Sequence, residues 1–192
     1  MNIMNPRLNS FIKTCDQLGQ SGCDAGSCVS AAAPLMLDLA GRGSDLLADD
    51  QKRVDTQMYA RNAIHLGDAD GVSLFALVWL PGQWTPIHDH GTWGVVGILE
   101  GVLEERSYLS IDNSLKDNDK IELQPGGIIL LGKGSVSTFV PNPDHIHMTG
   151  VPKDRDKVVS LHLYGRLMNN YHYYDLENSS RRLVDVSHFE SR

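Results

Sequence analysis

Cysteine is scarce in this sequence and is confined to one end of it. The three cysteines, Cys15, Cys23 and Cys28, all precede residue 30, and none follows in the rest of the chain. An odd number of cysteines without a Cys-x-x-Cys pair is a poor basis for a disulfide framework or a zinc site. We therefore expect reduced thiols, at least one of them on a helix face. The alternative is a redox-sensitive N-terminal segment.

Long apolar runs and an excess of basic residues are also missing. No apolar stretch approaches the roughly 18–20 residues of a membrane-spanning helix, and residues 1–14 lack an apolar signal core. The 24 acidic and 17 basic residues give a formal net charge of −7, which argues against nucleic-acid and anionic-membrane partners. We expect a cytoplasmic protein that binds neither and is a monomer or a weak homo-oligomer.

The N-terminal part of the sequence has helical periodicity. The 192 residues, 41% of them hydrophobic, suffice for one good core and one structural domain. Apolar residues at helical spacing predict a helix over residues 6–19, and further helices are expected near 31–39 and 44–51, the last capped by Ser44. We expect residues 1–54 to form a helical segment packed on a barrel made by residues 55–192.

After about residue 55 the pattern changes to short apolar or alternating runs separated by turn residues. Such a succession predicts a mainly β fold, either a sandwich or a small barrel of the jelly-roll type. The predicted strands lie near residues 57–65, 72–80, 93–100, 102–109, 121–124, 127–131, 136–140, 146–151 and 158–164. Pro125-Gly126-Gly127 is predicted to be a turn, and the last twenty residues are expected to wrap the surface.

A first histidine cluster lies in the middle of the sequence. Residues two apart on a strand share a face, so His88 and His90 would point the same way and could converge on one metal ion. The alternative for an isolated His-x-His pair is two surface histidines. The spacing from Gly82 through these histidines to Gly101 resembles the first motif of the cupin superfamily. The glutamate ligand of that motif is replaced by Gly94, so only histidines remain as ligands.

A second cluster follows about sixty residues later. His145 and His147 are two apart, and their spacing alone leaves both open as a further ligand. The run from 158 to 164 alternates strictly, which puts Ser160, His162 and Tyr164 on one face. On an inner barrel wall these side chains could satisfy one another by hydrogen bonds. The alternative is an edge strand whose polar face lies in water.

Several ordered motifs together resemble a known family. They are Tyr59-Ala60-Arg61-Asn62, His88-Asp89-His90, His147 and Ser160-Leu161-His162-Leu163-Tyr164. In this order they resemble the thiol dioxygenases, specifically the cysteine dioxygenase family, over roughly residues 55–166. That family's third ligand lies 13, 15 and 17 residues before its serine, histidine and tyrosine, which here selects His147. The resemblance implies a cupin-type jelly-roll β-barrel that holds Fe(II) through His88, His90 and His147.

The resemblance also implies an activity: oxidation of a small thiol carboxylate by O2 to its sulfinate. Arg61 would pair with the substrate carboxylate through its planar guanidinium, assisted by Tyr59, and Arg166 is a candidate for a second contact. Tyr164 would donate a hydrogen bond to the carboxylate or to oxygen, oriented by His162 and Ser160.

The identity of the thiol is contested by features of the sequence itself. Arginine at position 61 favours L-cysteine, because relatives that oxidise 3-mercaptopropionate tend to have glutamine there. The segments His90–Gly94 and Gly165-Arg166 instead resemble the mercaptopropionate group. We expect L-cysteine, with 3-mercaptopropionate or another mercapto-acid as the alternative. Two rival hypotheses are a metal cupin acting on a non-thiol substrate and a non-catalytic cupin that binds a small ligand.

Overall fold

The computed structural model of the chain describes residues 4–68, 71–111, 121–141 and 145–190. Its elements are α1 (Pro6–Gln20), α2 (Ala25–Arg42), the short 3-10 helices η1 (Ser44–Leu46) and η2 (Asp49–Gln51), and the strands β1 (Ala60–Leu66), β2 (Ser73–Trp79), β3 (Ile87–His88), β4 (Gly94–Glu100), β5 (Val102–Ser110), β6 (Leu123–Gly132), β7 (Val136–Phe139), β8 (Ile146–Gly150), β9 (Val158–Tyr164), β10 (Asn170–Asp175), β11 (Ser180–Asp185) and β12 (Phe189–Glu190). The predicted mainly β fold with N-terminal helices is confirmed.

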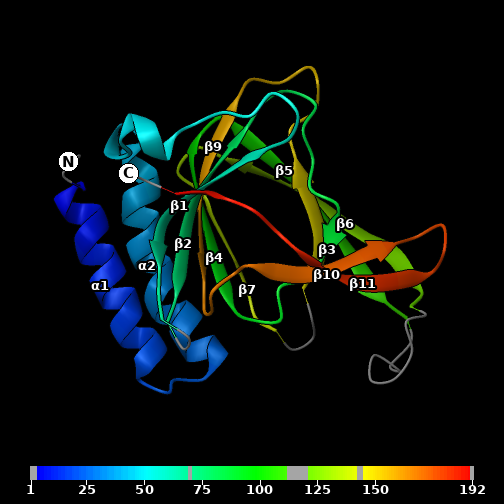
Figure 1. Cartoon of the computed structure of the whole chain (residues 1–192), viewed down its shortest axis with the longest axis horizontal. Helices are drawn as coiled ribbons and strands as arrows, with labels where there is room; N and C mark the ends of the chain where they lie inside the picture. The colour runs from blue at the N-terminus through cyan, green and yellow to red at the C-terminus, as the bar shows by residue number, and fades with distance from the viewer. Residues whose placement is uncertain (1–3, 69–70, 112–120, 142–144, 191–192) are drawn as a thin grey trace.

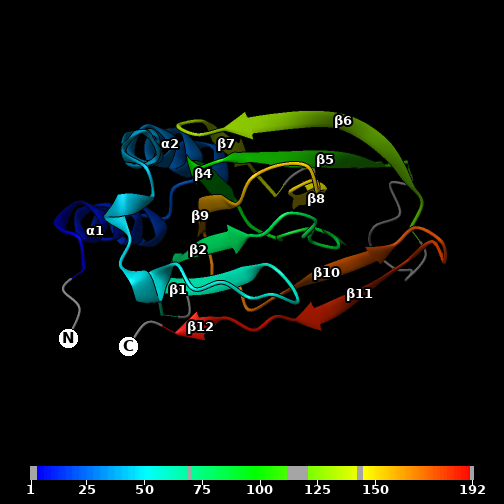
Figure 2. The same cartoon turned by 90° about the horizontal axis from the view of Figure 1, so that it is seen from above.

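The elements form three layers: two helices, a sheet against them, and a second sheet beyond it (Figure 1, Figure 2). The strand order of the first sheet, sheet A, is β12-β1-β2-β9-β4-β7. The strand order of the second, sheet B, is β11-β10-β3-β8-β5-β6. Figure 1 shows α1 and α2 beside β1, β2 and β4, with the strands of sheet B on the opposite side.

Sheet A is buried on both faces, and this positions the polar row. Strands β2 and β9 are buried at every residue, as expected for strands covered on both sides. One face packs Leu161 and Leu163 of β9 against the helices. Since successive side chains alternate, the other face directs Ser160, His162 and Tyr164 into the space between the sheets.

The helices differ from prediction in their limits. Helix α1 buries the expected stripe, but α2 begins six residues before its predicted start because the Asp24 side chain caps it, accepting from the Ser27 N–H at 3.0 Å. The helix predicted over 44–51 is instead the pair η1 and η2, since Leu47 between them is extended and buried. Among the helices of the described residues, none is both long and apolar enough to cross a membrane.

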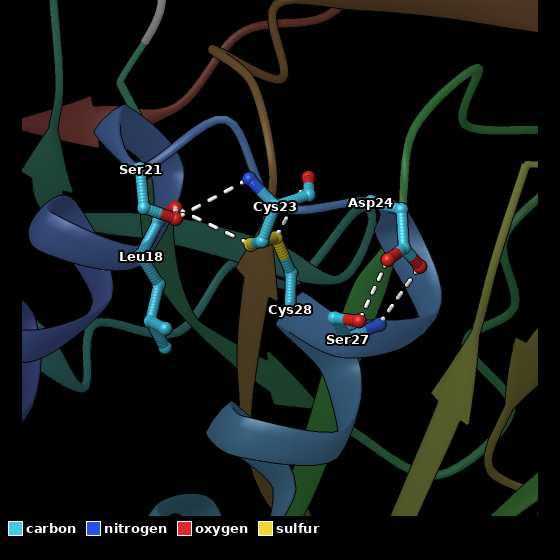
Figure 3. The surroundings of a disulfide bond; sticks show 6 residues. All are labelled: Leu18, Ser21, Cys23, Asp24, Ser27 and Cys28. Carbon is cyan, nitrogen blue, oxygen red and sulfur yellow. Dashed lines mark hydrogen bonds between the residues drawn. A yellow bond between two sulfur atoms is a disulfide. The ribbon is translucent and has the colours of Figure 1, made fainter.

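The early start of α2 also corrects the cysteine prediction. Cys28 lies in the first turn of α2, and Cys23 lies just before that helix. The two form a disulfide, and their Cα atoms are 5.8 Å apart (Figure 3). The expectation of reduced thiols is therefore wrong for this pair, because no sequence motif marks a bridge between a turn and a helix. Cys15 is free and buried on α1.

Removing this disulfide should destabilise the chain measurably. The double change Cys23→Ser and Cys28→Ser should lower the free energy of unfolding by about 2 kcal/mol, since a short closed loop restricts the unfolded chain only modestly. The thermal midpoint should fall by roughly 4–8 °C, as measured by calorimetry. Wild-type protein in excess reductant is the control and should fall equally. An unchanged midpoint on reduction would show that the bond is not formed in solution.

Two further predictions from the sequence are wrong. The expected turn at Pro125-Gly126-Gly127 lies within β6, an edge strand, where a proline's missing N–H needs no partner. The last residues do not simply wrap the surface, because β10 and β11 form a hairpin of sheet B and β12 pairs in parallel with β1. These strands were not predicted because most of their side chains are polar, although Tyr171 and Tyr174 of β10 are buried.

Candidate metal centre and the adjoining pocket

Three histidines meet between the sheets. The ligating nitrogens of His88, His90 and His147 lie within 4.8 Å of one another, and all three side chains are buried. The ring centroids are nearly equidistant, at 4.8 Å for His88–His90, 4.8 Å for His88–His147 and 4.9 Å for His90–His147. These three side chains could together hold one metal ion.

The backbone explains how these side chains converge. His88 and His147 are direct antiparallel partners on β3 and β8. The predicted reason why His88 and His90 point the same way, a shared strand, is wrong, because β3 ends at His88 and His90 lies in the irregular segment that follows. That segment is anchored by buried Asp89, which accepts hydrogen bonds from the Tyr174 hydroxyl at 2.8 Å and from the backbone N–H of His172 at 3.1 Å.

All three imidazoles are neutral near neutral pH. Burial lowers the pKa of His88 and of His90 well below the ordinary value, and neighbouring histidines lower both further. Burial also lowers the pKa of His147, although the nearby carboxylate of Glu105 partly opposes this. Neutral imidazoles have a lone pair available for a cation.

The nitrogen atoms that face away from the cluster fit a metal site. Nδ1 of His88 lies 3.0 Å from the Pro86 carbonyl and can donate to it, which leaves Nε2 for an ion. Nδ1 of His147 faces Glu105. Nδ1 of His90 is buried and has no hydrogen-bond partner among the described residues. The donor set of three neutral imidazoles therefore suits a divalent transition metal.

The fold also explains why position 94 contributes no ligand. A Cβ atom at Gly94 would overlap the ring of Phe139. That ring occupies the space and stacks on His90 with centroids 4.3 Å apart. A carboxylate side chain at position 94 would have to displace Phe139, so the cluster is limited to histidines.

A hydrogen-bonded row adjoins the cluster. Nε1 of Trp79 donates to Oγ of Ser160 at 3.0 Å, Oγ lies 2.9 Å from Nε2 of His162, and Nδ1 of His162 lies 3.2 Å from the Tyr164 hydroxyl. Burial lowers the pKa of His162 to about 3 and raises that of Tyr164 to about 12. Both side chains are therefore neutral at neutral pH.

His88 and His147 of the cluster and His162 and Tyr164 of the row line one pocket. Its described lining residues are Tyr59, Arg61, Leu77, Thr85, His88, His147, Thr149, His162, Tyr164, Met168 and Tyr171. Arg61 is the one permanently charged side chain among them, and none is acidic. Its guanidinium is buried, donates to the Met168 carbonyl at 2.7 Å and lies over the Phe75 ring. The pocket therefore favours an anionic group.

Arg166 lies outside this lining. Nε of Arg166 donates to the His90 carbonyl at 3.0 Å, and an Nη atom donates to the Asn170 carbonyl at 2.7 Å. These bonds join the segment that carries His90 to the start of β10. A contact between Arg166 and substrate has no support in this geometry, whereas Tyr59 and Arg61 both line the pocket.

Several residues of the pocket were not predicted from the sequence. Tyr171 lies on β10, where only Tyr171 and Tyr174 are buried and the sequence has no apolar alternation that could have revealed it. Thr85, Thr149 and Met168 belong to no motif, so nothing in the sequence indicated them. Glu105 is buried beside His147. Burial alone would raise its pKa, but hydrogen bonds from His145 and His147 lower that pKa below its ordinary value.

The neutral state of His162 predicts a pH dependence of stability. Its pKa is about 3 in the folded protein and about 6.5 in the unfolded chain, so the unfolded chain binds more protons between these values. Stability of the metal-free protein should therefore fall as the pH falls below 6.5. His162→Gln should remove about 2 kcal/mol of the loss between pH 7.5 and 5, measured from urea midpoints. Equal losses in both proteins would contradict this.

Comparisons with known proteins identify one family and several solved structures of low similarity. The chain matches the family model of cysteine dioxygenase type I over residues 48–177. An uncharacterized conserved protein with a double-stranded beta-helix domain from Klebsiella pneumoniae is 13% identical, with 74% of this chain and 99% of that chain covered and a TM-score of 0.44. A cupin-like protein from Thermotoga maritima is also 13% identical, with 74% and 90% covered and a TM-score of 0.42.

These two structural likenesses concern the fold alone. The family match is more specific, because its range contains the whole three-histidine cluster and the row from Ser160 to Tyr164. The resemblance expected from the sequence is thus confirmed over more than half of the chain, and the chain belongs to the cysteine dioxygenase type I family.

Proposed function

We propose that this protein is a thiol dioxygenase that uses Fe(II) and O2 to convert a small thiol carboxylate, with L-cysteine favoured, to its sulfinate. In the balanced reaction, RSH and O2 give RSO2H, and both oxygen atoms end on sulfur. One observation carries the proposal. Three neutral histidines lie together beside a pocket, and Arg61 is the one residue with a permanent charge among the described residues that line it.

The ligand set favours a thiolate at the metal. Three neutral imidazoles leave the 2+ charge of a divalent ion uncompensated. One carboxylate ligand in their place would halve that net charge. The thiol sulfur supplies the four electrons that dioxygen accepts, and bound iron(II) would mediate their transfer, which redox-inactive zinc cannot do. The side chains of the chain itself hold the ion, exclude bulk water by burial and orient the substrate.

Arg61 would bind the substrate carboxylate. Its bonds to the carbonyls of Met168 and Ser187 use two of its five donors. Those bonds and the Phe75 ring fix the guanidinium at the pocket wall. Tyr59 lines the same wall and would assist the same group.

Tyr164 would direct its hydroxyl proton into the pocket. The Trp79 indole can only donate, so Ser160 accepts from it and can donate its own proton to Nε2 of His162. Neutral His162 then carries its proton on Nδ1 and donates it to the Tyr164 oxygen. The Tyr164 proton is left for the substrate carboxylate or for oxygen.

Replacing Tyr164 with phenylalanine should slow turnover by about 10- to 100-fold, the value of one hydrogen bond to a charged group. Iron content should stay unchanged, because Tyr164 is not a ligand. Tyr108→Phe is the control, since that hydroxyl contacts Met148 instead. Steady-state oxygen uptake and metal analysis check both expectations, and loss of iron from the Tyr164 variant would show that its assigned role is wrong.

A second candidate substrate is 3-mercaptopropionate. The described lining of the pocket offers no carboxylate to pair with a substrate ammonium group. A thiol acid without an amine would therefore leave no buried charge unpaired. This observation favours mercapto-acids as rivals of L-cysteine.

Oxygen uptake by the iron-loaded protein tests the proposal. L-cysteine, 3-mercaptopropionate and mercaptosuccinate are each supplied, and the sulfinate is identified by mass spectrometry. We expect one O2 consumed per thiol, and the ratio of kcat/KM values identifies the preferred substrate. No uptake with any of the thiols would reject the proposal. Purified protein that neither contains nor takes up iron would instead favour a cupin that only binds a small ligand.

A further inference from the structure

A carboxylate and a fourth histidine lie directly behind His147. Glu105 on β5 is 3% exposed, and its Oε2 lies 3.6 Å from Nδ1 of His147. His145 immediately precedes β8 and places Nε2 3.1 Å from Oε1 of Glu105 and 3.1 Å from Nδ1 of His147. Nδ1 of His147 therefore has two competing neighbours.

The two neighbours can favour opposite forms of His147. A carboxylate only accepts hydrogen bonds, so donation from Nδ1 to Glu105, whose Oε2 lies 3.6 Å away, would hold the single proton of neutral His147 on Nδ1. Nε2 then keeps its lone pair for a metal ion. If His145 donated its Nε2–H to Nδ1 instead, the proton of His147 would be on Nε2, and that nitrogen could not bind a metal.

We propose that Glu105 is a positioning residue that fixes His147 in its metal-binding tautomer by accepting the Nδ1 proton and by drawing the Nε2–H of His145 to itself. Carboxylate partners of metal-binding histidines commonly act in this way. The Phe139 ring leaves no room for a carboxylate side chain at position 94. Glu105 instead places a carboxylate behind the candidate ligand His147. The inference depends on the proposed metal site, but not on a thiol substrate.

Metal affinity and tautomer state together test this role. Fe(II) affinity is measured anaerobically by competition with a chelator, and the tautomer of His147 in metal-free protein is read from imidazole ¹⁵N shifts. Glu105→Ala should weaken Fe(II) binding by about 10- to 100-fold and move the His147 proton to Nε2. Glu105→Gln should lose less affinity and keep the proton on Nδ1, because the amide oxygen still accepts.

A second change separates positioning from a general loss of structure. His145→Phe removes the competing donor but retains the stacking on Phe139, whose ring lies 5.1 Å away at an interplanar angle of 9°. Alone it should leave Fe(II) affinity unchanged. Combined with Glu105→Ala it should recover a large part of the lost affinity, which a collapsed site could not do.

The inference is overturned if Glu105→Ala binds Fe(II) like the wild type, if its His147 proton stays on Nδ1, or if His145→Phe gives no recovery. Should the alanine variant not fold, Glu105→Leu preserves the buried volume and is subject to the same three expectations. Neither readout involves a thiol. Failure here would leave the proposed reaction standing, and absence of thiol oxidation would leave this inference standing.

Discussion

His147→Ala should leave the protein folded but unable to retain iron. The change removes one of three candidate ligands from a buried site in which none of the three neighbouring histidines can take its place: His88 and His90 already belong to the cluster, and His145 faces Glu105. The loss of Fe(II) affinity should exceed the roughly 10- to 100-fold that removal of an outer partner causes. Oxygen uptake with every thiol should fall to background.

The measurement is iron content after anaerobic reconstitution, with circular dichroism to verify the fold. His65→Ala is the matched control, because that histidine also contacts a carboxylate, Asp16 at 2.9 Å, but lies outside the cluster. The control should retain one iron per chain. Stoichiometric iron in the His147 variant would show that a different set of ligands binds the metal.

Arg61→Ala should reduce kcat/KM for L-cysteine by about 100-fold. A bidentate, charge-assisted contact in a buried pocket contributes about 3 kcal/mol, and each 1.36 kcal/mol is a factor of ten in rate. Arg61→Lys retains the charge without the planar fork, so it should recover only part of the activity. Iron content should be normal in both variants, because Arg61 contacts no ligand nitrogen.

The decisive comparison uses cysteamine, which lacks a carboxylate. If Arg61 binds that group, the wild type should turn over cysteamine poorly and Arg61→Ala should lower that rate little further. An equal loss with both thiols would mean that the substitution damages the pocket rather than the carboxylate contact. Thermal unfolding measures the separate cost of losing the bonds to Met168 and Ser187.

The parts of the fold that the sequence predicts are those with a strong periodic signal. Strand β9 alternates strictly, and its Ser160, His162 and Tyr164 do project into one space. Helix α1 has a clear apolar stripe. In both cases the local pattern and the packing agree: α1 buries one face, and β9 packs its leucines against the helices and its polar row between the sheets.

The parts that escaped prediction depend on partners distant in sequence. Strand β6 passes through Pro125 because it is an edge strand, paired among the described residues only with β5. Tyr171 and Glu105 approach the site only through the pairing of β10 with β3 and of β5 with β8. No window of neighbouring residues contains that information.

The pairing of β10 with β3 has a consequence for synthesis on the ribosome. The segment that carries His90 is held by Tyr174 through Asp89, and the guanidinium of Arg61 is held by the Ser187 carbonyl. Both supporting residues follow all three histidines in the sequence. Chains emerge from the N-terminus, so a nascent chain would expose all three histidines before either support exists. Iron loading should therefore follow synthesis of β10 and of the segment after β11.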